Sequence, residues 1–103
     1  MRHAIALAAV LLCIPAFAAE HVVQQSGKAF SITSLQAKVG DTLIFQNKDP
    51  FVHNIFSLSE VHSFDLGTFA KGEVRKVVLE KAGRVEVECA VHPEMKLVVD
   101  VAK

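Results

Sequence analysis

The sequence has no tryptophan, no tyrosine and only two cysteines among its 103 residues. Two cysteines cannot build the disulfide framework that stabilises many small exported domains. The chain also lacks an excess of either charge, with 11 basic and 11 acidic residues. A balanced chain does not offer the basic surface that attracts nucleic acid or an anionic membrane. We therefore expect no nucleic acid among its partners and no insertion into a membrane.

No apolar run is long enough to cross a membrane. The longest, from Ala4 to Phe17, has about 14 residues, whereas a transmembrane helix needs roughly 20. It follows Arg2 and leads to the small residues Ala16 and Ala18, which is the pattern of a secretory signal peptide with its cleavage site. The sequence therefore predicts an exported, periplasmic protein.

Cleavage after Ala18 would leave residues 19–103 as one domain, which we expect to be a monomer. A lipoprotein would instead be processed at Cys13, and the bulky Leu12 before it argues against that alternative. Removal of the leader leaves Cys89 as a lone thiol in an oxidising compartment. Cys89 is then a buried bystander, an intermolecular bridge or a metal ligand.

Turn residues interrupt the mature chain about every 8 to 12 residues, a spacing typical of a β-sandwich or β-barrel. No segment longer than about ten residues carries a helical apolar stripe, so the predicted class is all-β. The expected strands are Val22–Gln25, Ala29–Ile32, Leu35–Val39, Thr42–Gln46, Asn54–Ser57, Asp65–Thr68, Val74–Leu79, Val85–Cys89 and Leu97–Val101.

The last two of these segments show the clearest alternation of apolar and polar residues. Val85, Val87 and Cys89 alternate with Glu86 and Glu88. A period of two indicates a half-buried strand, with Cys89 on its inward face.

Between these strands lies the run from Cys89 to Met95, with the spacing Cys-x2-His-x2-Met through His92. A second histidine, His53, stands far upstream where an apolar segment begins, followed by Asn54. A thiolate and two imidazoles with a weak axial thioether form a blue-copper site. The motif therefore favours His53, Cys89, His92 and Met95 as the ligands of one copper ion.

These residues resemble those of the cupredoxin family, and the short ligand loop is most similar to that of amicyanin. The resemblance implies a Greek-key β-sandwich of about seven or eight strands and a copper-bound one-electron carrier that is not an enzyme. It also implies that Asn54 ties the two ligand loops together. Redox partners, such as a cytochrome or an oxidoreductase, would dock near an exposed edge of His92.

Other interpretations stay open at this point. Cys89 and Met95 could be core residues, and the ligands could serve copper tolerance or delivery instead of electron transfer. A substrate-binding copper enzyme is disfavoured, because four protein ligands leave little room for an open position. Glu60, His62 and His21 are candidates for a second metal site; for His21 this requires that cleavage leave it within the first few residues.

Overall fold

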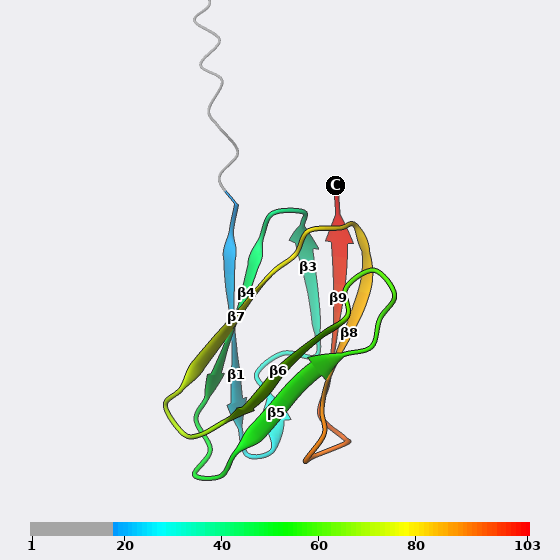
Figure 1. Cartoon of the computed structure of the whole chain (residues 1–103). Coiled ribbons are helices and arrows are strands. Elements are labelled where there is room, and N and C mark those ends of the chain that lie inside the picture. Colours follow the sequence, from blue (N-terminus) through cyan, green and yellow to red (C-terminus); the bar gives the residue numbers. More distant parts are fainter. Residues whose placement is uncertain (1–17) are drawn as a thin grey trace, which may run out of the picture.

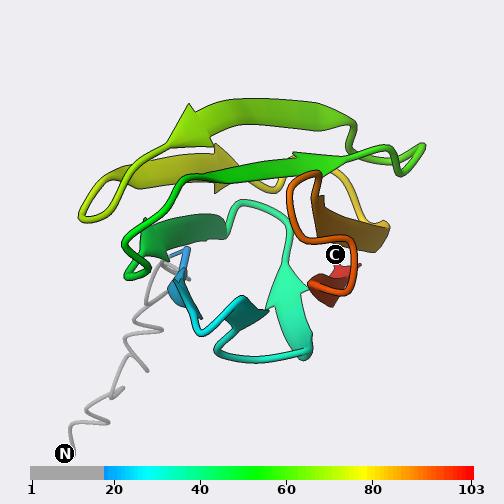
Figure 2. The same cartoon turned by 90° about the horizontal axis from the view of Figure 1, so that it is seen from below.

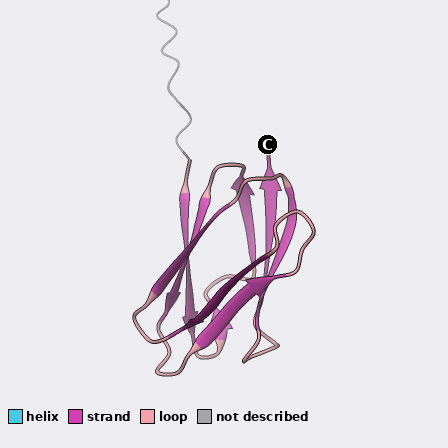
Figure 3. Ribbon diagram, viewed as in Figure 1, coloured by secondary structure: helices cyan, strands magenta, loops and turns pink. Residues whose placement is uncertain are grey.

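The described part of the chain forms two β-sheets packed face to face (Figure 1, Figure 3). A computed structural model describes residues 18–103, and these contain nine strands and no helix. One sheet has the order β2-β1-β4-β7 and the other β3-β9-β8-β5-β6. The strands are β1 (Glu20–Ser26), β2 (Ala29–Phe30), β3 (Ser34–Lys38), β4 (Thr42–Asn47), β5 (His53–Ser57), β6 (Phe64–Phe69), β7 (Val74–Val78), β8 (Gly83–Cys89) and β9 (Lys96–Ala102).

All nine expected segments are strands, so the all-β sandwich is confirmed and the expected count of seven or eight is slightly low. The segment expected to run to Ile32 ends earlier, at Phe30. Ser31 closes the pairing with two hydrogen bonds to the backbone of Gln24, after which the chain crosses to the other sheet. Apart from Ala18, the expected leader lies outside the described residues.

Five of the eight links between consecutive strands pass from one sheet to the other, which gives the sandwich its Greek-key topology. Two pairs of strands are parallel, β1 with β4 and β3 with β9, and the other pairs are antiparallel. None of the described residues belongs to a helix long and apolar enough to span a bilayer.

The core lies between the sheets and follows the predicted alternation. Val85, Val87 and Cys89 of β8 are at most 1% exposed, whereas Glu86 points outward. Burial of such aliphatic side chains supplies the main stabilisation of the fold, at about 25 cal/mol per Å². The other buried apolar residues include Val23, Leu43, Phe45, Ile55, Phe69, Leu79, Leu97 and Val99.

The topology brings the start of β5 beside the end of β8. These strands are antiparallel, with Ile55 opposite Cys89. The loop that follows β8 leads directly into β9, which pairs with β8 along its length. Figure 2 shows this loop in orange, next to the green β5, at one end of the sandwich. The predicted metal ligands therefore all come from segments that meet at this end.

Gly83, the first residue of β8, lies in a tightly packed part of the sandwich, at the end opposite the predicted metal ligands. Its φ is +136°, and a Cβ added there would lie 2.7 Å from Cγ1 of Val61. Gly83→Ala should therefore lower the free energy of unfolding by about 1–3 kcal/mol for overpacking, in addition to the cost of a positive φ. Gly72→Ala is the matched control, because Gly72 also has a positive φ but no neighbour within 4 Å of an added Cβ. Equal losses for the two variants in urea unfolding would contradict this packing.

Candidate metal centre

His53, Cys89 and His92 meet at the end of the sandwich where β5 begins. One donor atom from each lies within 4.8 Å of the others. Sγ of Cys89 is 3.5 Å from Nδ1 of His53. His53 and Cys89 are almost completely buried, and His92 is half-buried. Three of the four predicted ligands thus form one cluster, although 36 residues separate two of them.

The ring of His53 is held from its far side by Asp49. Nε2 of His53 lies 2.7 Å from Oδ2 of Asp49, inside the protein. A carboxylate accepts a hydrogen bond, so the ring proton is on Nε2 and Nδ1 keeps a free lone pair directed toward Cys89. A histidine oriented in this way by a carboxylate is the usual arrangement behind a metal-binding imidazole.

Asp49 is itself fixed by the turn between β1 and β2. Its carboxylate accepts hydrogen bonds from the backbone N–H groups of Gly27, at 2.7 Å, and Lys28, at 3.2 Å. Burial alone would raise the pKa of Asp49, but the hydrogen bonds from His53 and from these two amides outweigh it and lower the pKa. The carboxylate therefore stays charged and remains a strong acceptor for His53. The sequence patterns do not single out Asp49, and the available signal is its position four residues before His53.

One ring nitrogen of His92 takes part in no hydrogen bond within the described part of the protein. Nδ1 of His92 is buried and has no hydrogen-bond partner. A buried polar atom without a partner costs about 1–3 kcal/mol, so such an atom beside a thiol and a second imidazole fits a metal ligand. The ring also packs against Phe51, with centroids 5.2 Å apart.

Phe51 completes a cluster of three rings. Its centroid is 5.4 Å from that of His53, and the two histidine centroids are 5.2 Å apart. Phe51 therefore packs against both imidazoles and shields the site. Among the other phenylalanines, Phe45 and Phe69 are buried, whereas Phe56 and Phe64 are only half-buried.

Met95 is buried at the end of the same loop, with 2% of its surface exposed. Its backbone N–H donates to the carbonyl of His92 at 2.9 Å, which folds the loop into a tight turn. The loop is also tied to β5, because the N–H of Ala90 donates to the backbone carbonyl of Asn54 at 3.1 Å. A link at Asn54 is therefore present, but it is a main-chain hydrogen bond that a residue of any type could accept at this position.

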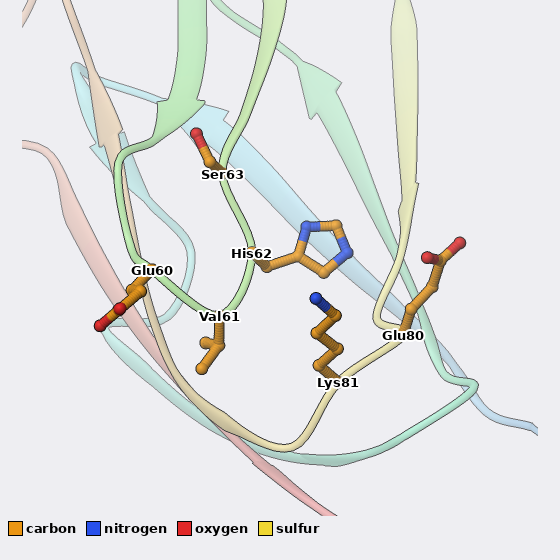
Figure 4. Close-up of a pocket in the computed structure, with 6 residues that line it drawn as sticks. All are labelled: Glu60, Val61, His62, Ser63, Glu80 and Lys81. Atoms are coloured by element: carbon orange, nitrogen blue, oxygen red, sulfur yellow. The ribbon is translucent and has the colours of Figure 1, made fainter.

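Glu60 and His62 do not converge on a site. They lie in the loop between β5 and β6, beside a surface cavity of about 220 Å³ at the other end of the molecule. Figure 4 shows the carboxylate of Glu60 pointing away from the ring of His62. His62 instead bonds the backbone carbonyl of Val78 at 2.8 Å. Within residues 18–103, His53, Cys89 and His92 form the one group of three His, Cys, Asp or Glu donors close enough to share a metal ion.

Asp49→Asn tests the orientation of His53. An amide can present its NH2 group to Nε2 and no longer selects the tautomer, so copper affinity should fall by about 10- to 100-fold. A competition titration against a copper chelator measures this. Asp65→Asn is the control, because the exposed Asp65 accepts a hydrogen bond only from the backbone of Gly67 among the described contacts. An unchanged affinity in Asp49→Asn would show that the carboxylate does not orient the ligand.

No protein-family model matches the chain. The methylamine utilization protein MauL of Methylorubrum extorquens is 32% identical to it over 99 residues, which are 95% of this chain and 87% of that protein.

Solved structures with the same fold include the following three. A copper-containing nitrite reductase (NirK) from Thermus scotoductus superposes with a TM-score of 0.75 and 25% identity over 82% of this chain, which spans only 22% of that enzyme. A reduced Cu(I) form of an amicyanin variant has a TM-score of 0.73 and 25% identity, covering 80% of this chain and 81% of that one. A purple cupredoxin from Nitrosopumilus maritimus, 22% identical, has a TM-score of 0.71 and covers 80% of this chain and 99% of that one. Together with MauL, these structures show that the chain belongs to the cupredoxin family.

Proposed function

We propose that the mature protein is a periplasmic electron carrier whose single type 1 copper ion is bound by His53, Cys89, His92 and Met95. When bound, copper supplies a centre that takes up one electron from a donor protein and passes it to an acceptor, as Cu(II) and Cu(I). The protein supplies the geometry around that centre and no catalytic group. The observation that carries the proposal is the buried cluster of His53, Cys89 and His92, in which Nδ1 of His53 lies against the thiol and the buried Nδ1 of His92 has no hydrogen-bond partner.

The donor set suits both oxidation states. Thiolate and thioether sulfur favour Cu(I), and imidazole serves Cu(II) as well. His53 and Cys89 are held in strands, and His53 is held on both sides, by Asp49 and by Cys89. A rigid donor set changes little between oxidation states, which keeps the reorganisation energy of electron transfer small. Burial also keeps water away from the thiolate.

The rim of the site supports electron transfer through His92. His92 is half-buried, and two apolar residues beside the cluster, Val52 and Val91, are 45% and 48% exposed. An apolar surface around a partly exposed imidazole suits short-lived contacts with redox proteins, because it desolvates easily and carries few charges to repel a partner. We propose that cytochromes or oxidoreductases dock there.

Copper delivery with the same ligands is the alternative function. Delivery requires that ligands be surrendered to an acceptor, whereas His53 and Cys89 are completely enclosed and pinned by their strands. This enclosure favours retention of the metal and therefore electron transfer. The similarity to a nitrite reductase does not lead us to propose an enzyme, since four protein donors would leave no open position on the copper for a substrate.

Copper(II) added to the mature protein should produce an intense thiolate-to-copper absorption band and the narrow hyperfine splitting of type 1 copper in electron paramagnetic resonance. Cys89→Ser should abolish both, because the hydroxyl cannot replace the thiolate. Ser57→Ala, a buried change outside the donor set, should keep them. A chain that stays colourless with copper would overturn the proposal.

Val52→Glu should slow electron self-exchange between copper-loaded molecules by about tenfold or more, because two like charges then meet at the contact. Nuclear magnetic resonance line broadening in mixtures of the two oxidation states measures this rate. The control is Leu58→Glu, since Leu58 is 78% exposed and follows the other end of β5. Both variants should keep the absorption band of the parent protein. If Leu58→Glu slows exchange equally, docking does not occur at the His92 rim.

A further inference from the structure

A cluster of polar groups surrounds the carboxylate of Asp41 at the end of the sandwich opposite His53 and Cys89. The backbone nitrogen of Ala19 lies 2.9 Å from Oδ1 of Asp41, and Nε2 of His21 lies 2.8 Å from Oδ2 of the same carboxylate. These residues line a surface cavity of about 400 Å³. Figure 1 shows β1 beginning at the top of the molecule, away from the orange ligand loop. The two clusters are therefore separate.

The fold holds both Ala19 and Asp41 in place. The carbonyl of Ala19 accepts a hydrogen bond from the N–H of Thr42 at 3.0 Å, where β1 joins β4. Asp41 is 5% exposed, and its Oδ2 also accepts the N–H of Lys38 at 2.9 Å. The hydrogen bond from His21, together with those from the backbone of Lys38 and Ala19, lowers the pKa of Asp41 to about 2. The carboxylate is thus charged at neutral pH.

Processing after Ala18 would change the chemistry of this cluster. The nitrogen of Ala19, an amide in the precursor, would become the primary amine of the mature chain. The ordinary pKa of an α-amino group is only about 7.7–8.0, so Cu(II) can displace its proton near neutral pH and bind the amine. The mature chain would then begin Ala19-Glu20-His21, with an amine, an imidazole and a carboxylate at one place.

We propose that the mature protein carries a second copper(II) site, formed by the α-amine of Ala19, Nε2 of His21 and the carboxylate of Asp41. Two nitrogens and an oxygen in a tetragonal arrangement are donors that suit Cu(II). Adjacent ligands about 2.0 Å from a metal stand roughly 2.8 Å apart, close to the separations now spanned by hydrogen bonds. Each nitrogen therefore already lies about as far from an oxygen of Asp41 as two neighbouring ligands of one metal ion do, and water in the open cavity can complete the coordination.

This site would differ in kind from the first. It has no sulfur ligand, so it would not give the intense absorption band and would bind Cu(II) in preference to Cu(I). Lys38 also lines the cavity, but its side chain is exposed and its charge is screened by salt. The site is therefore suited to holding copper(II) at the surface and not to rapid electron exchange. It does not depend on the electron-carrier proposal.

The test uses protein exported with its own leader, whose mass shows whether it begins at Ala19. Copper(II) chloride is added beyond one equivalent, and binding is followed by competition with a chelator and by electron paramagnetic resonance. We expect a second equivalent with the wide hyperfine splitting of a copper site without thiolate. A different first residue, or no second equivalent, would overturn the proposal.

Three variants test the donors one at a time: His21→Gln, Asp41→Asn and a chain with one extra glycine ahead of Ala19. Each should weaken the binding of the second copper equivalent by at least about tenfold. His62→Gln is the matched control and should still bind the second copper equivalent. His62 is half-buried like His21, but its ring is bonded to a backbone carbonyl and not to Asp41. Unchanged circular dichroism shows that each variant folds, independently of the first site. Retention of the second equivalent by Asp41→Asn or by the extended chain would refute this donor set.

Discussion

The pairing of β5 with β8 is the constraint on which the rest of the structure depends. Because Ile55 lies opposite Cys89, the inward side chain of Cys89 comes within 3.5 Å of Nδ1 of His53. The same pairing places the loop after β8 beside the start of β5, so that His92 and Met95 arrive at one end of the core. A metal bound there would join two segments distant in the sequence and stabilise the closed end of a small domain, whose core alone provides limited stability.

Two buried aspartates fix the two ends of the sandwich in the same way. Asp49 holds His53 and the amides of Gly27 and Lys28, and Asp41 holds His21 and the amides of Ala19 and Lys38. Each carboxylate receives enough hydrogen bonds to remain charged although little water reaches it. The first strand is thus anchored near both ends by a carboxylate. At one end the histidine faces the proposed copper centre, and at the other it lies near Ala19, the predicted first residue of the mature chain.

The two ends of the sandwich differ in how exposed their donor groups are, and this difference suits them to different functions. At the His92 end, Val52 and Val91 form an apolar rim around deeply buried donors, which suits brief contact with another protein. At the Asp41 end, the donors line an open cavity, which suits exchange of small solutes with the solvent. One domain can therefore combine an enclosed redox centre with an accessible binding site, since the strands keep the two apart.

The sequence by itself determined the strands, the inward position of Cys89 and the spacing of Cys89, His92 and Met95, because these depend on local periodicity. It also pointed to His53 through its neighbour Asn54 and the family resemblance. Tertiary structure decided what no local pattern records: that Asp49 orients His53, that Asn54 links the loops through its carbonyl, and that Glu60 and His62 stay apart. Hydrogen-bond partners of buried charges depend on which turns pack together, and packing is set by the whole fold.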